Sequence, residues 1–235
     1  MKQILTDLPL RTYASLPEGK PEQAGVFFHG YGADGQDLFN ISGVLRRFFP
    51  NAAFYFPDAP EELGFFGGYQ WFSLDGYDPA VLSDPAAGKE YLDSLMPLAE
   101  IARGVTDPYM RAVLKHSGVS ADKAVLCGFS QGGLMAVYTA LRFHEKLAAA
   151  VGLSAVAVMF DGKTFSPDKI VSKPPVTLIH GDADNVVPPA VFELNQQNLR
   201  NAGLSVESFV VPDLMHGIDE TALRHLCSTL QKSFA

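Results

Sequence analysis

Short runs of apolar residues, separated by longer helical patterns, are the feature that most constrains how this chain can fold. The apolar runs cover residues 24–28, 52–56, 123–127, 148–154, 175–180 and 206–211, and the helical patterns lie near residues 37–48, 88–117, 131–145, 189–202 and 217–233. Runs without alternation are typical of strands buried on both faces of a parallel sheet. The pattern therefore predicts an α/β fold, in which a mostly parallel central sheet carries helices on both faces.

Residues 57–87 interrupt this regular alternation. The stretch combines Pro, Gly and Asp with several aromatic side chains, namely Phe65, Phe66, Tyr69, Trp71, Phe72 and Tyr77. A long irregular segment inside a compact domain tends to be a binding loop or a lid. We therefore expect one α/β domain over residues 1–235, with a lid-like or binding segment around residues 57–87.

The helical pattern at residues 88–117 contains the pair Asp107-Pro108. A residue that precedes proline is pushed out of the helical region of φ/ψ space. We expect this pair to break or kink the helix.

Composition excludes several classes of protein. The chain has 235 residues, of which 47% are hydrophobic and 19% charged, so it can bury a sizeable core. Its net charge of −8 argues against binding to a nucleic-acid backbone, which requires clustered Lys and Arg. The two cysteines, Cys127 and Cys227, predict neither a disulfide framework nor a thiolate metal site.

The first residues and the hydropathy pattern predict a cytoplasmic protein. Asp7 and Pro9 interrupt the amino-terminal stretch before an apolar run could become the core of a signal peptide. No segment approaches the roughly 18 consecutive apolar residues of a membrane span. We therefore expect no stable insertion into a membrane.

The stretch "GFSQGG" predicts a serine nucleophile. Ser130 lies between an apolar run and a helical pattern, and Gly128 and Gly132 flank it two residues away on either side. Glycines allow a sharp, strained turn from strand to helix, in which the serine hydroxyl points outward. The same glycines could instead serve only close packing. The nucleophile hypothesis therefore requires an acid, a base and hydrogen-bond donors at the carboxyl ends of other strands.

Candidate acids and a candidate base follow Ser130 along the chain. Asp182 and Asp184 come just after the apolar run at 175–180, and either carboxylate could orient a histidine. His216 follows the last apolar run, in a short loop before the final helix. Serine, aspartate and histidine in this order resemble the chain order of the α/β-hydrolase triad. The other histidines lie at helix ends, within a helix or, as His29 and His180, before glycines, where they are expected to orient loops.

Backbone donors for a developing oxyanion are predicted in two places. The loop "HGYG" follows an early apolar run, and its glycines free the N–H of Tyr31 to face a ligand. The N–H of Gln131 lies at the amino terminus of the helix that follows Ser130, where the helix dipole favours negative charge. The glycines in these loops lack the spacing of a nucleotide-binding motif.

The motifs "FFHGYGADGQDL", "YQWFSL", "GFSQGG", "HGDADNVVP" and "MHG" occur in this order over residues 23–232. Together they resemble the carboxylesterase/phospholipase family of α/β-hydrolases, in a bacterial-looking form, and this family includes the acyl-protein thioesterases. The resemblance implies an α/β-hydrolase fold, a catalytic triad of Ser130, Asp184 and His216, and no cofactor or metal. It also implies that Tyr31 and Gln131 form the oxyanion hole. Trp71 and Phe72 correspond to residues that border the acyl site.

These observations predict a serine carboxylesterase that acts on small acyl esters of short to medium chain length. An acyl thioesterase or lysophospholipase on longer chains is the alternative within the same fold. A catalytically silent hydrolase fold that serves as a binding module is a remote alternative, because such a chain would be expected to lack a triad residue. Exposed aromatic surface around residues 65–72 leaves a homodimer open as well.

Overall fold

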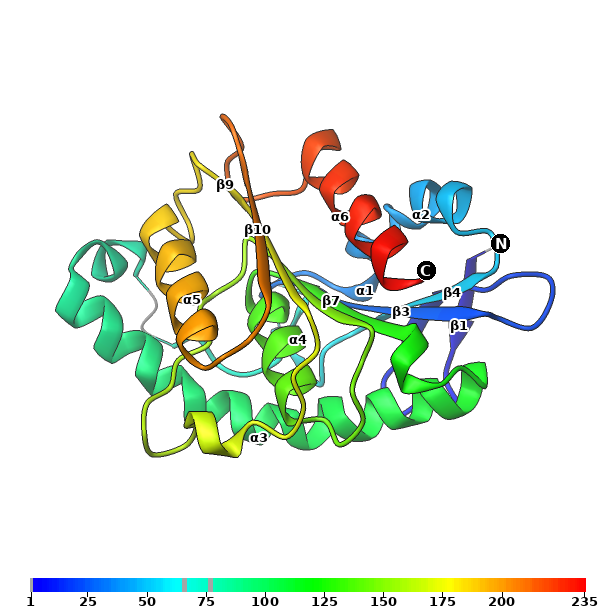
Figure 1. Ribbon diagram of the computed structural model, residues 1–235, viewed down its shortest axis with the longest axis horizontal. Coiled ribbons are helices and arrows are strands. Elements are labelled where there is room, and N and C mark those ends of the chain that lie inside the picture. Colours follow the sequence, from blue (N-terminus) through cyan, green and yellow to red (C-terminus); the bar gives the residue numbers. More distant parts are fainter. Residues whose placement is uncertain (1, 65–66, 76–77) are drawn as a thin grey trace.

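The computed structural model of the protein describes residues 2–64, 67–75 and 78–235, and its centre is an eight-stranded sheet (Figure 1). The strands follow the order β1-β2-β4-β3-β7-β8-β9-β10 across the sheet. Their bounds are Lys2–Leu5 (β1), Thr12–Ser15 (β2), Gln23–Phe28 (β3), Ala52–Pro57 (β4), Ala124–Phe129 (β7), Ala149–Leu153 (β8), Val176–Gly181 (β9) and Val206–Val211 (β10). All neighbours from β4 to β10 in this sheet are parallel, whereas β1 pairs with β2, and β2 with β4, in the antiparallel direction.

The predicted fold class is confirmed. Each apolar run identified in the sequence forms one of the parallel strands, and most boundaries agree within a residue or two. The antiparallel edge strands β1 and β2 were not predicted, because four residues are too few for a distinct pattern.

Helices cover both faces of the sheet. The structure has α1 (Gly35–Phe39), α2 (Ser42–Phe48) and α6 (Glu220–Ser233) on one face, and α3 (Pro85–Ser117), α4 (Gln131–Arg142) and α5 (Pro189–Asn201) on the other (Figure 1). Short 3-10 turns are η2 (Pro79–Ser83), η3 (Ala121–Lys123) and η4 (Pro167–Lys169). The helix expected at residues 37–48 is thus two helices, and the other predicted helices are single elements.

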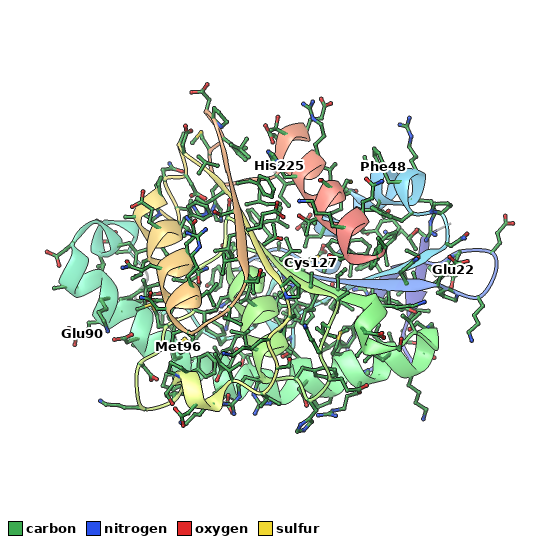
Figure 2. All side chains as sticks on the ribbon, viewed as in Figure 1. Glu22, Phe48, Glu90, Met96, Cys127 and His225 are labelled. Atoms are coloured by element: carbon green, nitrogen blue, oxygen red, sulfur yellow. The ribbon has the colours of Figure 1, made fainter. Side chains whose placement is uncertain are left out.

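Strand β7 separates the two layers of the core. Its side chains alternate between them: Leu126 belongs to the cluster under α3 and α4, whereas Val125 and Cys127 belong to the cluster under α1, α2 and α6. Figure 2 shows side chains filling the space on both sides of the sheet, with Cys127 near the middle of the molecule. Because β7 is buried on both faces, the turn that follows it rests on a rigid support.

The predicted break at Asp107-Pro108 is wrong. Helix α3 continues through both Pro97 and Pro108. A proline inside a helix costs about 3 kcal/mol, because it removes a hydrogen bond and crowds the preceding turn. Directly after Pro108, Tyr109 and Met110 are fully buried against the sheet, and burying each such side chain contributes roughly 1.5–3 kcal/mol. This burial offsets the local cost.

The segment at residues 57–87 is short of regular structure, as expected. It contains the two-stranded pair β5 (Glu61–Glu62) and β6 (Tyr69–Gln70), followed by η2. Phe65, Phe66 and Tyr77 lie outside the described residues. The segment adjoins the loops at the carboxyl ends of the parallel strands through an isolated bridge between Ala33 and Tyr69. Whether it acts as a lid stays a prediction.

Candidate active site

Ser130 lies in a strained turn between β7 and α4. Its φ of 55° and ψ of −118° are in a region that side chains rarely adopt, which costs about 1–3 kcal/mol. A Cβ added at Gly128 would overlap the carbonyl oxygen of Gly132, and one added at Gly132 would overlap the carbonyl oxygens of Phe28 and His29. Both positions therefore require glycine for the turn to close.

Hydrogen bonds hold this turn against its neighbours. The N–H of Ser130 donates to the carbonyl of Leu153 at the end of β8, at 2.9 Å. The Ser130 carbonyl accepts from the N–H groups of Gly133 and Leu134, at 2.9 and 3.2 Å. The turn is thus fixed to the sheet on one side and to the first turn of α4 on the other.

His216, which is partly exposed, and the buried Asp184 form a hydrogen bond near this turn. The Nδ1 of His216 lies 2.8 Å from Oδ2 of Asp184, and the aspartate is 3% exposed. The other carboxylate oxygen accepts from the N–H groups of Val186 and Val187, at 3.0 and 2.8 Å. Burial alone would raise the pKa of Asp184, but the hydrogen bonds from His216 and these amides outweigh it and lower the pKa. The carboxylate is therefore ionised at neutral pH.

Asp182, the other candidate acid, has a different environment. It is exposed, and its Oδ1 accepts from the N–H of Asp213 at 2.7 Å. Asp213 has a positive φ of 57°, so this bond supports a strained turn after β10. Of the two aspartates that the residue pattern left open, Asp184 is the one bonded to His216.

The loop that carries Tyr31 follows β3 and packs on Ser130. An added Cβ at Gly30 would lie 3.3 Å from the Cβ of Ser130. The amide of Gly32 donates to the carbonyl of Tyr69 at 3.0 Å. Gln131 is the first residue of α4, so its N–H has no acceptor within the helix. The two predicted donor residues therefore flank the serine.

His29 orients this loop, as the sequence predicted. Its Nε2 accepts from the N–H of Ala59 at 2.9 Å, so its Nδ1 carries the proton and donates to the carbonyl of Gly30 at 2.7 Å. Burial lowers its pKa and keeps the ring neutral. His180 has a similar role: its Nε2 lies 2.8 Å from the Val187 carbonyl and 3.4 Å from Oδ2 of Asp184.

A cavity of about 160 Å³ brings the serine and the histidine together. Ser130, His216 and Tyr31 form its polar part. The remaining lining is aliphatic apart from one tyrosine, and consists of Leu74, Leu82, Tyr91, Leu92, Leu95, Val156, Val186 and Val187. The sequence reasoning missed the contribution of α3 to this wall. A helical pattern identifies an apolar stripe, but not which part of it reaches a loop on another strand.

Trp71 and Phe72 lie behind the site. They are 1% and 4% exposed, and neither belongs to the lining of the cavity next to Ser130. The Trp71 ring packs on Phe28, with centroids 4.4 Å apart, and its Nε1 donates to the His29 carbonyl at 2.8 Å. These contacts favour a role for Trp71 in supporting the donor loop over one as a wall of this cavity.

The described part of the chain contains neither a candidate metal site nor an exposed thiol. Within it, no group of three or more His, Cys, Asp or Glu side chains could hold a metal ion. Both cysteines are free and buried, and burial raises the pKa of the Cys127 thiol. Among the described helices, none is both long and apolar enough to cross a membrane.

Comparisons with known proteins place the chain in a family. A model of the family described as phospholipase/carboxylesterase matches residues 14–234. Esterase YpfH of Escherichia coli (strain K12) is 31% identical over 224 residues, which are 93% of this chain and 88% of that protein. Acyl-protein thioesterase 1 homolog 2 of Dictyostelium discoideum is 32% identical over 122 residues, covering 49% of this chain and 52% of that protein.

A solved structure gives the same result for the fold. The crystal structure of esterase PE8 aligns with a TM-score of 0.78 and 31% identity, over 93% of this chain and 96% of the other. The chain therefore belongs to the phospholipase/carboxylesterase family of α/β-hydrolases, and it is a hydrolase of the esterase/thioesterase type.

Proposed function

We propose that this protein is a serine carboxylesterase that hydrolyses short- to medium-chain acyl esters through an acyl-enzyme on Ser130. The observation that carries the proposal is the shared cavity of Ser130 and His216, with Asp184 bonded to the far side of the imidazole at 2.8 Å. A nucleophile, a base and an orienting acid in this relation are the parts that serine hydrolysis requires.

In the proposed mechanism, Ser130 Oγ attacks the ester carbonyl while His216 Nε2 accepts the hydroxyl proton. Nε2 is the acceptor because Nδ1 donates to Asp184, whose ionised carboxylate also stabilises the imidazolium that forms. The imidazolium then protonates the leaving alcohol as the tetrahedral intermediate collapses to the acyl-enzyme. Water hydrolyses the acyl-enzyme by the same route, and Ser130 regains its proton.

The backbone N–H groups of Tyr31 and Gln131 are the proposed oxyanion donors. Gln131 begins α4, so its amide combines a free donor with the positive end of the helix dipole. In other serine hydrolases one such donor contributes about 3 kcal/mol to the stability of the transition state.

The size of the cavity supports short to medium acyl chains. Its volume of about 160 Å³ lies below the roughly 300–1,000 Å³ of sites that enclose drug-sized ligands. Its walls of leucine and valine side chains suit an alkyl chain, because they offer no polar partner. Esterase YpfH, which is named as an esterase, is similar over nearly the whole chain.

Hydrolysis of p-nitrophenyl esters from acetate to palmitate tests the proposal. We expect kcat/KM to peak between C2 and C8, and the Ser130→Ala variant to lose at least about 10³-fold in kcat. Labelling with a fluorophosphonate, followed by peptide mass mapping, should identify Ser130 as the modified residue. Turnover that survives Ser130→Ala would overturn the mechanism, and no turnover or labelling would favour the binding-module alternative.

A thioesterase or lysophospholipase acting on longer chains is the second candidate. A further cavity of about 480 Å³ lies between the start of α3 and the start of α5. It shares the side chains of Leu82 and Leu92 with the cavity at Ser130, and its lining is largely apolar. The similar Dictyostelium protein is named an acyl-protein thioesterase. A maximum at palmitate, or faster hydrolysis of acyl-CoA thioesters than of oxygen esters, would favour this candidate.

The cytoplasmic location and a homodimer stay predictions. Sedimentation equilibrium of the purified chain, whose mass is 25.4 kDa, would distinguish one copy from two.

A further inference from the structure

Residues 69–72 lie directly against the loop that carries Tyr31. The N–H of Gly32 donates to the Tyr69 carbonyl at 3.0 Å, and the N–H of Tyr69 donates to the Ala33 carbonyl at 2.8 Å. A Cβ added at Gly68 would overlap the carbonyl of Gly32, so the two backbones approach as closely as backbones can. The position of this loop is therefore tied to residues 69–72.

Trp71 adds a side-chain bond to the same loop. Its Nε1 donates at 2.8 Å to the carbonyl of His29, two residues before Tyr31. An indole N–H is a donor only, so this bond has one possible direction. Since the ring is 1% exposed, water cannot replace the bond if it is lost, and the carbonyl would be left unpaired at a cost.

Gln131 connects residues 71 and 72 to the other proposed donor. Its side chain is 1% exposed. Its Oε1 accepts from the N–H of Trp71 at 3.0 Å, and its Nε2 donates to the carbonyl of Phe72 at 2.7 Å. Both ends of the amide are thus used, and each is matched to the backbone group that it contacts. The side chain pairs with residues 71–72 much as another peptide group would.

We propose that the Gln131 side chain is a positioning residue for the oxyanion hole. Through Trp71 and Phe72, it fixes the distance between its own backbone N–H and the N–H of Tyr31. This role rests on the proposed function, because it acts on the donors of that reaction. It also makes Tyr69, Trp71 and Phe72 the anchor of the 57–87 segment, so that a displacement of these three residues would change the donor spacing.

The chemistry explains why an amide is suited to this position. A carboxylate could accept from Trp71 but could not donate to Phe72, and it would be a charge in a buried place. An alkyl side chain of the same length would fill the space but leave both backbone groups without a partner. Either change would release residues 71–72 from the first turn of α4 and let the two donors move apart.

The test compares Gln131→Met with Trp71→Phe, and uses Gln70→Met as the matched control. Gln70 is an amide in the same stretch, but it bonds the exposed carboxylate of Glu61 at 2.9 Å. For each variant, kcat and KM are measured on the best p-nitrophenyl ester. The inhibition constant of a trifluoromethyl ketone, which forms an oxyanion when a serine adds to it, is measured against that of the matching methyl ketone.

We expect Gln131→Met to lower kcat about 10- to 100-fold, with KM changed by no more than about twofold. A displaced oxyanion donor still stabilises the transition state in part, so the loss in kcat is smaller than the loss on removing the donor. Trp71→Phe should lower kcat about 3- to 10-fold, as one hydrogen bond is lost. In both, the inhibition constant of the trifluoromethyl ketone should rise by the same factor as kcat falls, and that of the methyl ketone should not. Gln70→Met should match the wild type.

A general loss of structure would not give this pattern, because it would weaken both ketones alike. If circular dichroism shows that Gln131→Met is not folded, Trp71→Phe becomes the variant that tests the inference, since it leaves α4 unchanged. Ser130-dependent hydrolysis with unaltered kcat and trifluoromethyl ketone binding in the folded variants would overturn the inference but not the proposed function. Absence of Ser130-dependent hydrolysis in the wild type would overturn both.

Discussion

Helices α3 and α4 pack together on one face of the sheet, yet their sequences obey different constraints. Helix α4 is buried from Gln131 to Leu141, and added side-chain atoms at its first glycines, Gly132 and Gly133, would overlap neighbouring residues. Helix α3 is much longer and accepts two prolines in its interior. It also leaves Ile101 74% exposed, and Gly104 has no atom within 4 Å of an added Cβ.

The difference reflects what each helix does. Helix α4 begins directly after Ser130, so its first turn must fit between the loop after β3 and the end of β8. Helix α3 reaches the cavity at Ser130 only near its start, through Tyr91, Leu92 and Leu95, and along the rest of its length it has to bury an apolar stripe, a task that many contacts share. Its sequence therefore tolerates local penalties that would not be tolerated at the start of α4. Four substitutions test this interpretation: two at aspartates in the loop after β9, and two at glycines within α4 and α3.

The largest effect is expected at Asp184, in the loop after β9. Asp184→Asn keeps the size of the side chain and leaves an oxygen to accept from the amides of Val186 and Val187. The new amide nitrogen can donate to His216 but cannot accept from it, so the imidazole would be held in the wrong tautomer. We expect kcat to fall about 10⁴-fold with little change in KM. Steady-state kinetics on a p-nitrophenyl ester measures this.

Asp182→Asn is the matched control, two residues away in the same loop. Asp182 is exposed, and its Oδ1 accepts a hydrogen bond from the N–H of Asp213. An asparagine oxygen can accept the same bond, so kcat should remain within about twofold of the wild type. Comparable losses of kcat in both variants would show that hydrolysis depends on the conformation of this loop and not on the carboxylate bonded to His216.

Gly132→Ala is expected to have the next largest effect. The added methyl group would overlap the backbone carbonyls of Phe28 and His29, and backbone in a buried strand cannot move aside. Overpacking of this kind costs up to about 3 kcal/mol, and here it also displaces Ser130. We expect a lower urea midpoint with an unchanged m-value, together with nearly complete loss of hydrolysis. Wild-type stability and activity would show that the turn is not as closed as the structure indicates.

The sequence predicted the parallel sheet and the order serine, aspartate, histidine, because those features leave local patterns, whereas the choice of Asp184 over Asp182 came from the family resemblance. Continuous apolar runs indicate strands buried on both faces, and glycines around a serine indicate a turn without room for side chains. Tertiary packing determines the features that the sequence did not predict. Pro108 lies in a continuous helix because the residues after it are buried, and Trp71 faces the donor loop because its indole meets the His29 carbonyl. Neither outcome can be inferred from neighbouring residues.

Gly104→Ala should give the smallest effect, with the opposite sign. Glycine inside a helix is unfavourable by about 0.5–1 kcal/mol relative to alanine, mainly because a glycine loses more backbone conformational entropy when the chain folds. The added methyl group would meet open space, so nothing opposes that gain. We expect the urea midpoint to rise while kcat and KM stay unchanged. The same substitution would then stabilise α3 and disrupt the start of α4, which only a difference in surroundings can explain. A loss of stability at Gly104 would instead mean that α3 is as constrained as α4, and the contrast between the two helices would fail.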